Sequence, residues 1–252
     1  METMTIAIVG GTGMLGRPVA AELSSRGHEV RVLSRNAPEY RIDLTTGEGL
    51  IPALKGCDAV VDASNNSSPR GAAATLVDGS RRLLQAEEAA GAGHHVCVSI
   101  VGCEQLPMGY YRAKVDQERV VEQGPVPWSI VRATQFHELI ATWLAIAARW
   151  RVLPVPHAAL QTVAAAEVAA AIADVATGGP RAGRITVAGP EVSDARDMAR
   201  VWRAVTGSRA PLLPVPVPGR TGRALRSGVL TTERPDVRGM TGFADWLRSA
   251  RR

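Results

Sequence analysis

The stretch Ile6-Ala-Ile-Val-Gly-Gly-Thr-Gly-Met-Leu-Gly16 decides the fold, because a short apolar run breaks there into a glycine-rich turn. A continuous run of β-branched residues is typical of a buried parallel strand, and glycines directly after it let the backbone turn toward a pyrophosphate at a helix N-terminus. Two spacings fit, G-x-G-x-x-G from Gly11 and G-x-x-G-x-x-G from Gly10. A turn built only for packing is the alternative interpretation.

The sequence that follows the glycines supports a dinucleotide site. Residues 18–26 have helical spacing, and Pro18 is tolerated in a first helical turn. The next strand, residues 29–35, ends at Ser34 and Arg35, about 20 residues after the glycines, where NAD-binding folds normally carry Asp or Glu. A guanidinium group offers charge and two hydrogen bonds to a 2′-phosphate. This favours NADP(H), with an arginine merely solvated at a strand end as the alternative.

Strand and helix signals alternate through the first part of the chain. Strands are expected at 58–64, 95–100 and 128–132, and helices near 49–55, 71–90 and 110–123. This alternation predicts an α/β fold with a doubly wound parallel sheet, Rossmann-like, in which the loop 65–70 follows a strand and lies at the ligand-binding edge.

Beyond about residue 150 the alternation weakens and proline becomes more frequent. The remaining signals, at 167–177, 184–188, 194–206, 212–218 and 242–248, predict a small C-terminal α+β cap. We therefore expect an NADP-binding Rossmann domain over residues 1–150. A smaller substrate or cap region, residues 151–252, is expected to pack on the same core.

Composition excludes several classes of protein. The 252 residues are 46% hydrophobic, with no stretch typical of a transmembrane helix or signal peptide, which predicts a cytoplasmic protein. The net charge of +5 comes from dispersed arginines, so neither nucleic acid nor a membrane is an expected partner. Cys57, Cys97 and Cys103 lack metal-ligand spacing and are expected to be reduced core residues. His94 and His95 are expected on opposite faces of one strand.

The residues that can carry chemistry are Tyr110 and Lys114. Four residues apart on a helix, they lie on one face, and an ammonium beside a phenol favours the phenolate. Tyr110, with an ordinary pKa near 10, is then expected to have a lowered pKa and to exchange protons near neutrality. The Y-x-x-x-K pattern alone is weak, and a surface helix is the alternative. Its place one strand after a Rossmann start makes it more specific.

The whole chain resembles the NmrA-like, atypical short-chain dehydrogenase/reductases. The resemblance rests on the glycine turn, Arg35, the Tyr110/Lys114 pair, the segments 128–137 and 160–168, and Gly189-Pro-Glu191 with Phe243-Ala-Asp-Trp-Leu247. It implies that the glycine turn holds the pyrophosphate, that Asp43 faces the adenine, and that Lys114 bonds the nicotinamide ribose. It also implies that the stretch 134–137 passes the nicotinamide and the substrate. The implied cofactor residues are Gly10, Thr12, Gly13, Met14, Leu15, Gly16, Ser34, Arg35, Asp43, Ser64, Asn65, Lys114 and Phe136, and the implied substrate residues are Gln135 and His137.

One position departs from the pattern of this family. Many short-chain reductases carry a catalytic serine after the fifth strand, often as the second of a Ser-Ser pair, whereas this chain has Ser99-Ile100. Ser99 as a substitute oxyanion donor and Ser99 as a strand-end residue bonded to the backbone both stay open. His137 is open in the same way, between a substrate or proton-shuttling role and a packed or capping histidine.

These observations predict an NADP(H)-dependent oxidoreductase with Tyr110 and Lys114 as its catalytic residues. It would reduce a carbonyl, a quinone or an activated double bond of a small substrate, apolar or aromatic because the segment 137–150 is apolar. The alternatives are a non-catalytic NADP(H)-binding redox sensor and an isomerase or epimerase with bound cofactor. We expect a monomer or homodimer, with no metal.

Overall fold

The computed structural model describes residues 2–250 and is built around an eight-stranded sheet. Every pairing within this sheet is parallel, and the strand order is β12-β9-β6-β5-β4-β1-β2-β3. The strands are β1 (Thr5–Val9), β2 (Glu29–Ser34), β3 (Tyr40–Arg41), β4 (Ala59–Asp62), β5 (His94–Ile100), β6 (Trp128–Ala133), β9 (Arg184–Ala188) and β12 (Val237–Arg238). The predicted doubly wound parallel sheet is therefore confirmed.

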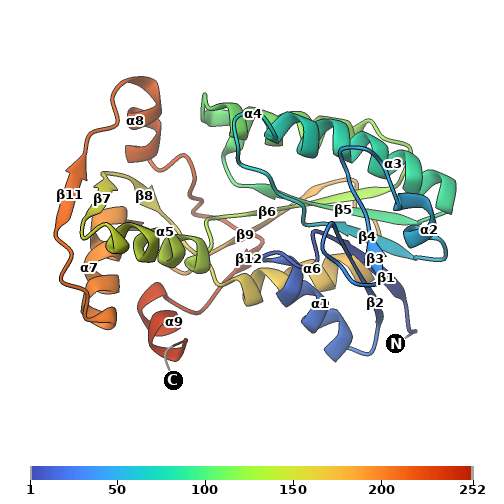
Figure 1. The fold of residues 1–252 in the computed structure, drawn as a ribbon, viewed down its shortest axis with the longest axis horizontal. Helices are drawn as coiled ribbons and strands as arrows, with labels where there is room; N and C mark the ends of the chain where they lie inside the picture. Colours follow the sequence, from blue (N-terminus) through green and yellow to red (C-terminus); the bar gives the residue numbers. More distant parts are fainter. Residues whose placement is uncertain (1, 251–252) are drawn as a thin grey trace.

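Helices cover both faces of this sheet (Figure 1). One face carries α1 (Gly16–Ser25) and α6 (Ala165–Thr177), and the other carries α2 (Leu50–Leu54), α3 (Gly79–Ala90) and α4 (Gly109–Glu122). Alternate residues of each strand serve alternate faces: Ile6 and Ile8 of β1 pack with α1 and α6, while Ala7 and Val9 pack with α2 and α3. Two-sided burial explains why these strands are continuously apolar in sequence.

A C-terminal lobe lies beyond the carboxyl ends of the strands (Figure 1). Its apolar cluster joins α5 (His137–Arg149), α7 (Ala195–Thr206) and α9 (Phe243–Ser249) with β7 (Leu153–Pro156) and β11 (Leu212–Val215). The remaining elements are α8 (Gly219–Arg226), the short strands β8 (Ala159–Leu160) and β10 (Ser193–Asp194), and the 3-10 turn η2 (Cys103–Gln105). Small helices and extra sheets at the C-terminus match the expected cap.

The apolar clusters do not divide at residue 150. Helix α5 belongs to the cluster of the lobe, whereas α6 and β9 return to the core of the main sheet. The chain thus leaves the sheet after β6 and comes back to it before forming the rest of the lobe. A domain boundary at residue 150 stays a prediction.

Three local expectations can be compared with the structure. The helix expected at 71–90 is interrupted, because Ala73–Asp78 forms a π-helical turn before α3 begins at Gly79. Leu76 in this turn and Leu83 in α3 are both fully buried. The adjacent histidines do point to opposite faces: His94 contacts Ser129, and His95 contacts Glu87. All three cysteines are free and buried, as expected.

Candidate functional site

The glycine-rich turn joins β1 to α1 at the point where the strand order reverses, between β1 and β4. Gly10 has a φ of +75°, and a side chain there would lie 2.8 Å from the carbonyl oxygen of Ala63. A Cβ on Gly16 would lie 2.3 Å from the carbonyl oxygen of Gly10. Gly13 is exposed, and its only close neighbour is that same oxygen, at 3.0 Å. Gly10 and Gly16 therefore allow the turn to close, while Gly13 leaves the outer backbone bare.

The three turn residues other than glycine differ in exposure. Thr12 is half-buried and Met14 is exposed, but the side chain of Leu15 packs into the core beside α6. Only the backbone of Leu15 can therefore contribute to a ligand site. The amides of Gly10, Gly11 and Gly13 bond to carbonyl oxygens within the fold. What fits a pyrophosphate is the position of the bare turn at a helix N-terminus, which a ligand can approach closely.

Two polar side chains at the carboxyl edge of the sheet have buried atoms without partners. The Ser64 hydroxyl, just after β4, has no hydrogen-bond partner among the described residues, and neither does the side-chain amide of Gln135 after β6. Both residues follow strands at the carboxyl edge of the sheet. Buried polar groups are nearly always paired, so these two fit a polar ligand that supplies the missing hydrogen bonds. Phe136, next to Gln135, packs partly against the main core.

Arg35 follows β2 and is exposed, and it forms no ion pair among the described residues. Its neighbour Ser34 accepts a hydrogen bond from the amide of Asn36. Asp43, expected near the adenine, accepts hydrogen bonds from the amide and the hydroxyl of Thr45, which hold the pKa of its carboxyl below the usual range. The guanidinium of Arg35 adds to that lowering. The free charge of Arg35 fits a phosphate on the adenosine ribose.

Tyr110 is the predicted catalytic residue, but its contacts differ from the expected ones. Its hydroxyl donates to Asn65 Oδ1 at 2.9 Å, and its ring meets Tyr111 edge-on with centroids 5.4 Å apart. Burial raises the pKa of Tyr110 to about 12, and the hydrogen bond to Asn65 offsets only part of this rise. The expected lowering of the pKa is therefore wrong, and at neutral pH the hydroxyl is a proton donor.

Lys114 shows why the expected pairing fails. Its side chain is buried, and Nζ donates to the carbonyl of Val98 at 3.0 Å and to Gln117 Oε1 at 2.9 Å. Gln117 in turn donates to Asp62 and Ser80. The ammonium is thus used in a buried network beneath α4 and forms no hydrogen bond with Tyr110. A contact of Lys114 with a ribose stays a prediction.

His137, another candidate, lies in the interior of the protein. His137 is fully buried, with Nδ1 2.8 Å from the Thr162 hydroxyl and Nε2 2.9 Å from the carbonyl oxygen of Thr241. The carbonyl fixes Nε2 as the donor, so Nδ1 accepts from Thr162, and burial lowers the pKa of the ring. Both ring nitrogens are thus engaged, and the rings of Phe243 and Trp246 pack against the imidazole. These contacts favour the packed histidine, and a role toward substrate stays a prediction.

Ser99 is 2% exposed and lies on the face of β5 turned toward Glu118 and Cys103. Its buried hydroxyl has no hydrogen-bond partner among the described residues. A role for Ser99 as oxyanion donor stays a prediction. The sequence did not show that Asn65 is the partner of Tyr110. Its position directly after a strand at the ligand-binding edge was the available signal.

Comparisons with known proteins agree with this geometry. Residues 10–178 match a family model described as NAD(P)H-binding. Photosystem II assembly factor Ycf39 of Trieres chinensis is 30% identical over 149 residues, covering 54% of this chain and 47% of that protein. The same factor from Synechocystis sp. is 32% identical over 117 residues, covering 41% and 36%. This chain thus matches about half the length or less of these relatives.

Solved structures share the fold at low identity. A nucleoside-diphosphate-sugar epimerase from Staphylococcus aureus superposes with a TM-score of 0.78 at 16% identity, covering 97% of this chain and 100% of that one. An NADPH-dependent quinone oxidoreductase, QOR2, complexed with NADPH, from Escherichia coli gives 0.75 at 16% identity, covering 98% and 100%. Within residues 2–250, no helix is long and apolar enough to cross a membrane, and no three His, Cys, Asp or Glu side chains gather as a metal site.

Proposed function

The chain belongs to the NAD(P)H-binding family, and its sequence resembles the short-chain dehydrogenase/reductases. From this we propose that it is an NADPH-dependent reductase. Its substrate would be a small apolar or aromatic carbonyl compound, quinone or activated alkene. The observation that carries the proposal is the Tyr110 hydroxyl. It remains protonated at neutral pH and sits beside Asn65 at the carboxyl edge of the sheet, where a proton donor is needed for reduction.

Different residues of the proposed site would bind different groups of the cofactor. The bare backbone at Gly13 would receive the pyrophosphate, and the free guanidinium of Arg35 would receive the 2′-phosphate. Ser64 and Gln135 would pair their orphaned polar atoms with the cofactor or the substrate. When bound, NADPH supplies a hydride. Tyr110 would deliver the accompanying proton from its hydroxyl, so that hydride and proton together reduce one double bond.

A second candidate, a non-catalytic NADP(H)-binding sensor, is favoured by two observations. Asn65, rather than a serine, accepts the hydrogen bond of the Tyr110 hydroxyl, and Lys114 is held in a buried network rather than beside the phenol. The Ycf39 relatives are named as assembly factors, which is also compatible with a binding role. An isomerase or epimerase is the third possibility. The cytoplasmic location and the monomeric or homodimeric state stay predictions.

The test measures NADPH oxidation with a panel of quinones and ketones, beside the affinities for NADPH and NADH. Turnover identifies the reductase, binding without turnover the sensor, and redox-neutral conversion of a substrate the isomerase. Gly13→Val is the binding control, because its side chain would occupy the bare face of the turn. Equal affinity for NADH and NADPH would contradict the NADP assignment. Normal dinucleotide binding by folded Gly13→Val would contradict the site itself.

A further inference from the structure

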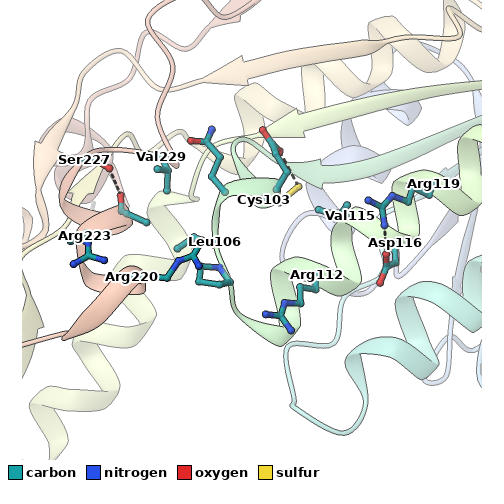
Figure 2. Close-up of a pocket in the computed structure, with 14 residues that line it drawn as sticks. Cys103, Leu106, Arg112, Val115, Asp116, Arg119, Arg220, Arg223, Ser227 and Val229 are labelled. Carbon is teal, nitrogen blue, oxygen red and sulfur yellow. Dashed lines mark hydrogen bonds and ion pairs between the residues drawn. The ribbon is translucent and has the colours of Figure 1, made fainter.

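A second hollow lies outside the proposed cofactor cleft, between α4, the segment 103–107 and α8 (Figure 2). Its volume is about 750 Å³, which is within the range of small-molecule sites. None of its lining residues belongs to the predicted cofactor or substrate set. On α4 the lining residues are Arg112, Val115, Asp116 and Arg119, a helix face rotated away from Tyr110. We call this hollow the α4–α8 groove.

The α4–α8 groove has more positive than negative side chains in its lining. Arg112 and Arg119 reach it from α4, and Arg220 and Arg223 from α8, as Figure 2 shows. The two lining carboxylates already have partners: Asp116 pairs with Arg119 at 2.9 Å, and Glu104 lies 3.3 Å from Arg132, which is outside the groove. Within residues 2–250, Arg112, Arg220 and Arg223 form no ion pair.

Three unpaired guanidinium groups around one hollow repel each other, and an anion between them would remove that repulsion. Arginine also offers paired donors matched to phosphate or carboxylate oxygens. Two elements from distant parts of the sequence supply these groups, so the positive charge is focused on the groove rather than spread along one helix.

Apolar residues share the lining of the groove with the charged ones. Leu106 is buried, and Val115, Ala224 and Val229 are half-buried. A lining that combines arginines with apolar side chains selects a ligand that has both characters. We propose that the α4–α8 groove binds a small organic anion that carries phosphate or carboxylate groups on an apolar, ring-sized body. The inference does not depend on reductase activity, because its test is binding.

The test is calorimetric titration of the full chain with phenyl phosphate, isophthalate, inorganic phosphate and benzyl alcohol. We expect saturable binding of the two aromatic dianions, at least tenfold weaker binding of inorganic phosphate, and none of the neutral alcohol. Comparing phenyl phosphate with isophthalate tells whether the natural ligand carries phosphate or carboxylate. Added salt should weaken binding, because the guanidinium groups are exposed.

The variant that tests the site is the double substitution Arg220→Ala with Arg223→Ala. Both residues are exposed on α8, and alanine favours helix, so the fold should be retained. Aromatic dianion binding should fall at least tenfold while NADPH affinity stays unchanged. Arg209→Ala, an exposed arginine in the loop before β11, is the matched control and should bind normally.

Two results would overturn the proposal. One is unchanged dianion binding in the double variant. The other is binding that disappears in Arg35→Asp but survives in the double variant, because this would place the anion in the cofactor cleft.

Discussion

The buried network beneath α4 and the rim of the proposed cofactor site differ in the hydrogen bonding of their polar side chains. In the network, Asp62, Ser80, Gln117 and Lys114 satisfy one another, and Asp62 also accepts from the amide of Ser64. At the rim, the hydroxyl of Ser64 and the amide of Gln135 are unpaired, and Arg35 carries a free charge. The two regions are joined at Ser64, which uses its backbone in one and leaves its hydroxyl to the other.

The difference distinguishes residues that stabilise the fold from residues that are available to bind a ligand. Leaving buried polar atoms unpaired costs stability, so we infer that the unpaired atoms of the rim serve ligand binding. Substitutions in the network should therefore change the free energy of unfolding. Substitutions at the rim should change binding or turnover and leave stability nearly unchanged.

The largest effect is expected at Tyr110. Tyr110→Phe removes the proton donor but keeps the ring, so turnover should fall about 10²- to 10⁴-fold with NADPH affinity and unfolding free energy nearly unchanged. Steady-state kinetics on a confirmed substrate and thermal unfolding measure the two. Tyr111→Phe, on the neighbouring ring, is the control and should be nearly silent.

The raised pKa of Tyr110 also predicts a pH profile. A donor with a pKa of about 12 stays protonated, so the rate of reduction should not fall between about pH 6 and about pH 9 through loss of this proton. Full activity of Tyr110→Phe would leave protonation by solvent or the sensor function. A decline that is abolished by Tyr110→Phe would show a lowered pKa after all.

The sequence predicted the sheet and the turn because each depends on local signals. The run before Gly10 has no polar residue, and the positive φ of Gly10 together with the 2.3 Å approach at Gly16 admits only glycine without distortion. The short strands β7 and β11 were harder to predict. Prolines at 154, 156 and 214 lie within them, and each strand pairs only with the other, so pairing rather than periodicity defines them.

The candidate site was predictable in position but not in its hydrogen bonds. Helical spacing places Tyr110 and Lys114 on one face, yet it does not show that Gln117, one turn later, captures the ammonium. His137 likewise follows a strand at the ligand-binding edge, but Thr162 and Thr241 come from distant segments and occupy both ring nitrogens. Contacts between distant segments are absent from local patterns.

A substitution at Arg35 tests whether the rim determines cofactor affinity. Arg35→Asp should weaken NADPH binding by about 2 to 4 kcal/mol, because a charge-assisted contact is lost and repulsion is added. Binding of NADH should change little, and so should the unfolding temperature, since Arg35 is exposed. Fluorescence titration with both cofactors measures the selectivity, with Arg209→Asp as control. Equal losses for NADH and NADPH would assign Arg35 to general electrostatics instead.

A substitution at Lys114 tests whether the buried network stabilises the fold. Lys114→Met leaves the Val98 carbonyl and Gln117 Oε1 buried without their donor, so the unfolding free energy should fall by about 2 to 3 kcal/mol. Lys55→Met makes the same substitution at an exposed position and should cost little. Denaturant unfolding measures both. If the two variants were equally stable, the buried network would not stabilise the fold. That result would contradict the proposed contrast between the network and the rim.

The smallest effect concerns His94, a buried group of the interior whose partner is Ser129. Ser129 accepts from the amide of Arg181, and its hydroxyl lies 2.9 Å from Nε2 of His94. Burial lowers the pKa of the ring to about 4. Since the unfolded chain takes up this proton first, the contribution of His94 to stability is complete above about pH 6.5 and is lost as the pH falls toward 4. Between about pH 7.5 and about pH 5 the wild type should therefore lose about 2 kcal/mol more than His94→Gln, which can still accept from Ser129. Chemical denaturation at the two pH values measures this difference, and His157→Gln at the exposed histidine controls for the loss of an imidazole. Parallel pH dependence in wild type and His94→Gln would show that the buried ring is not the group that titrates.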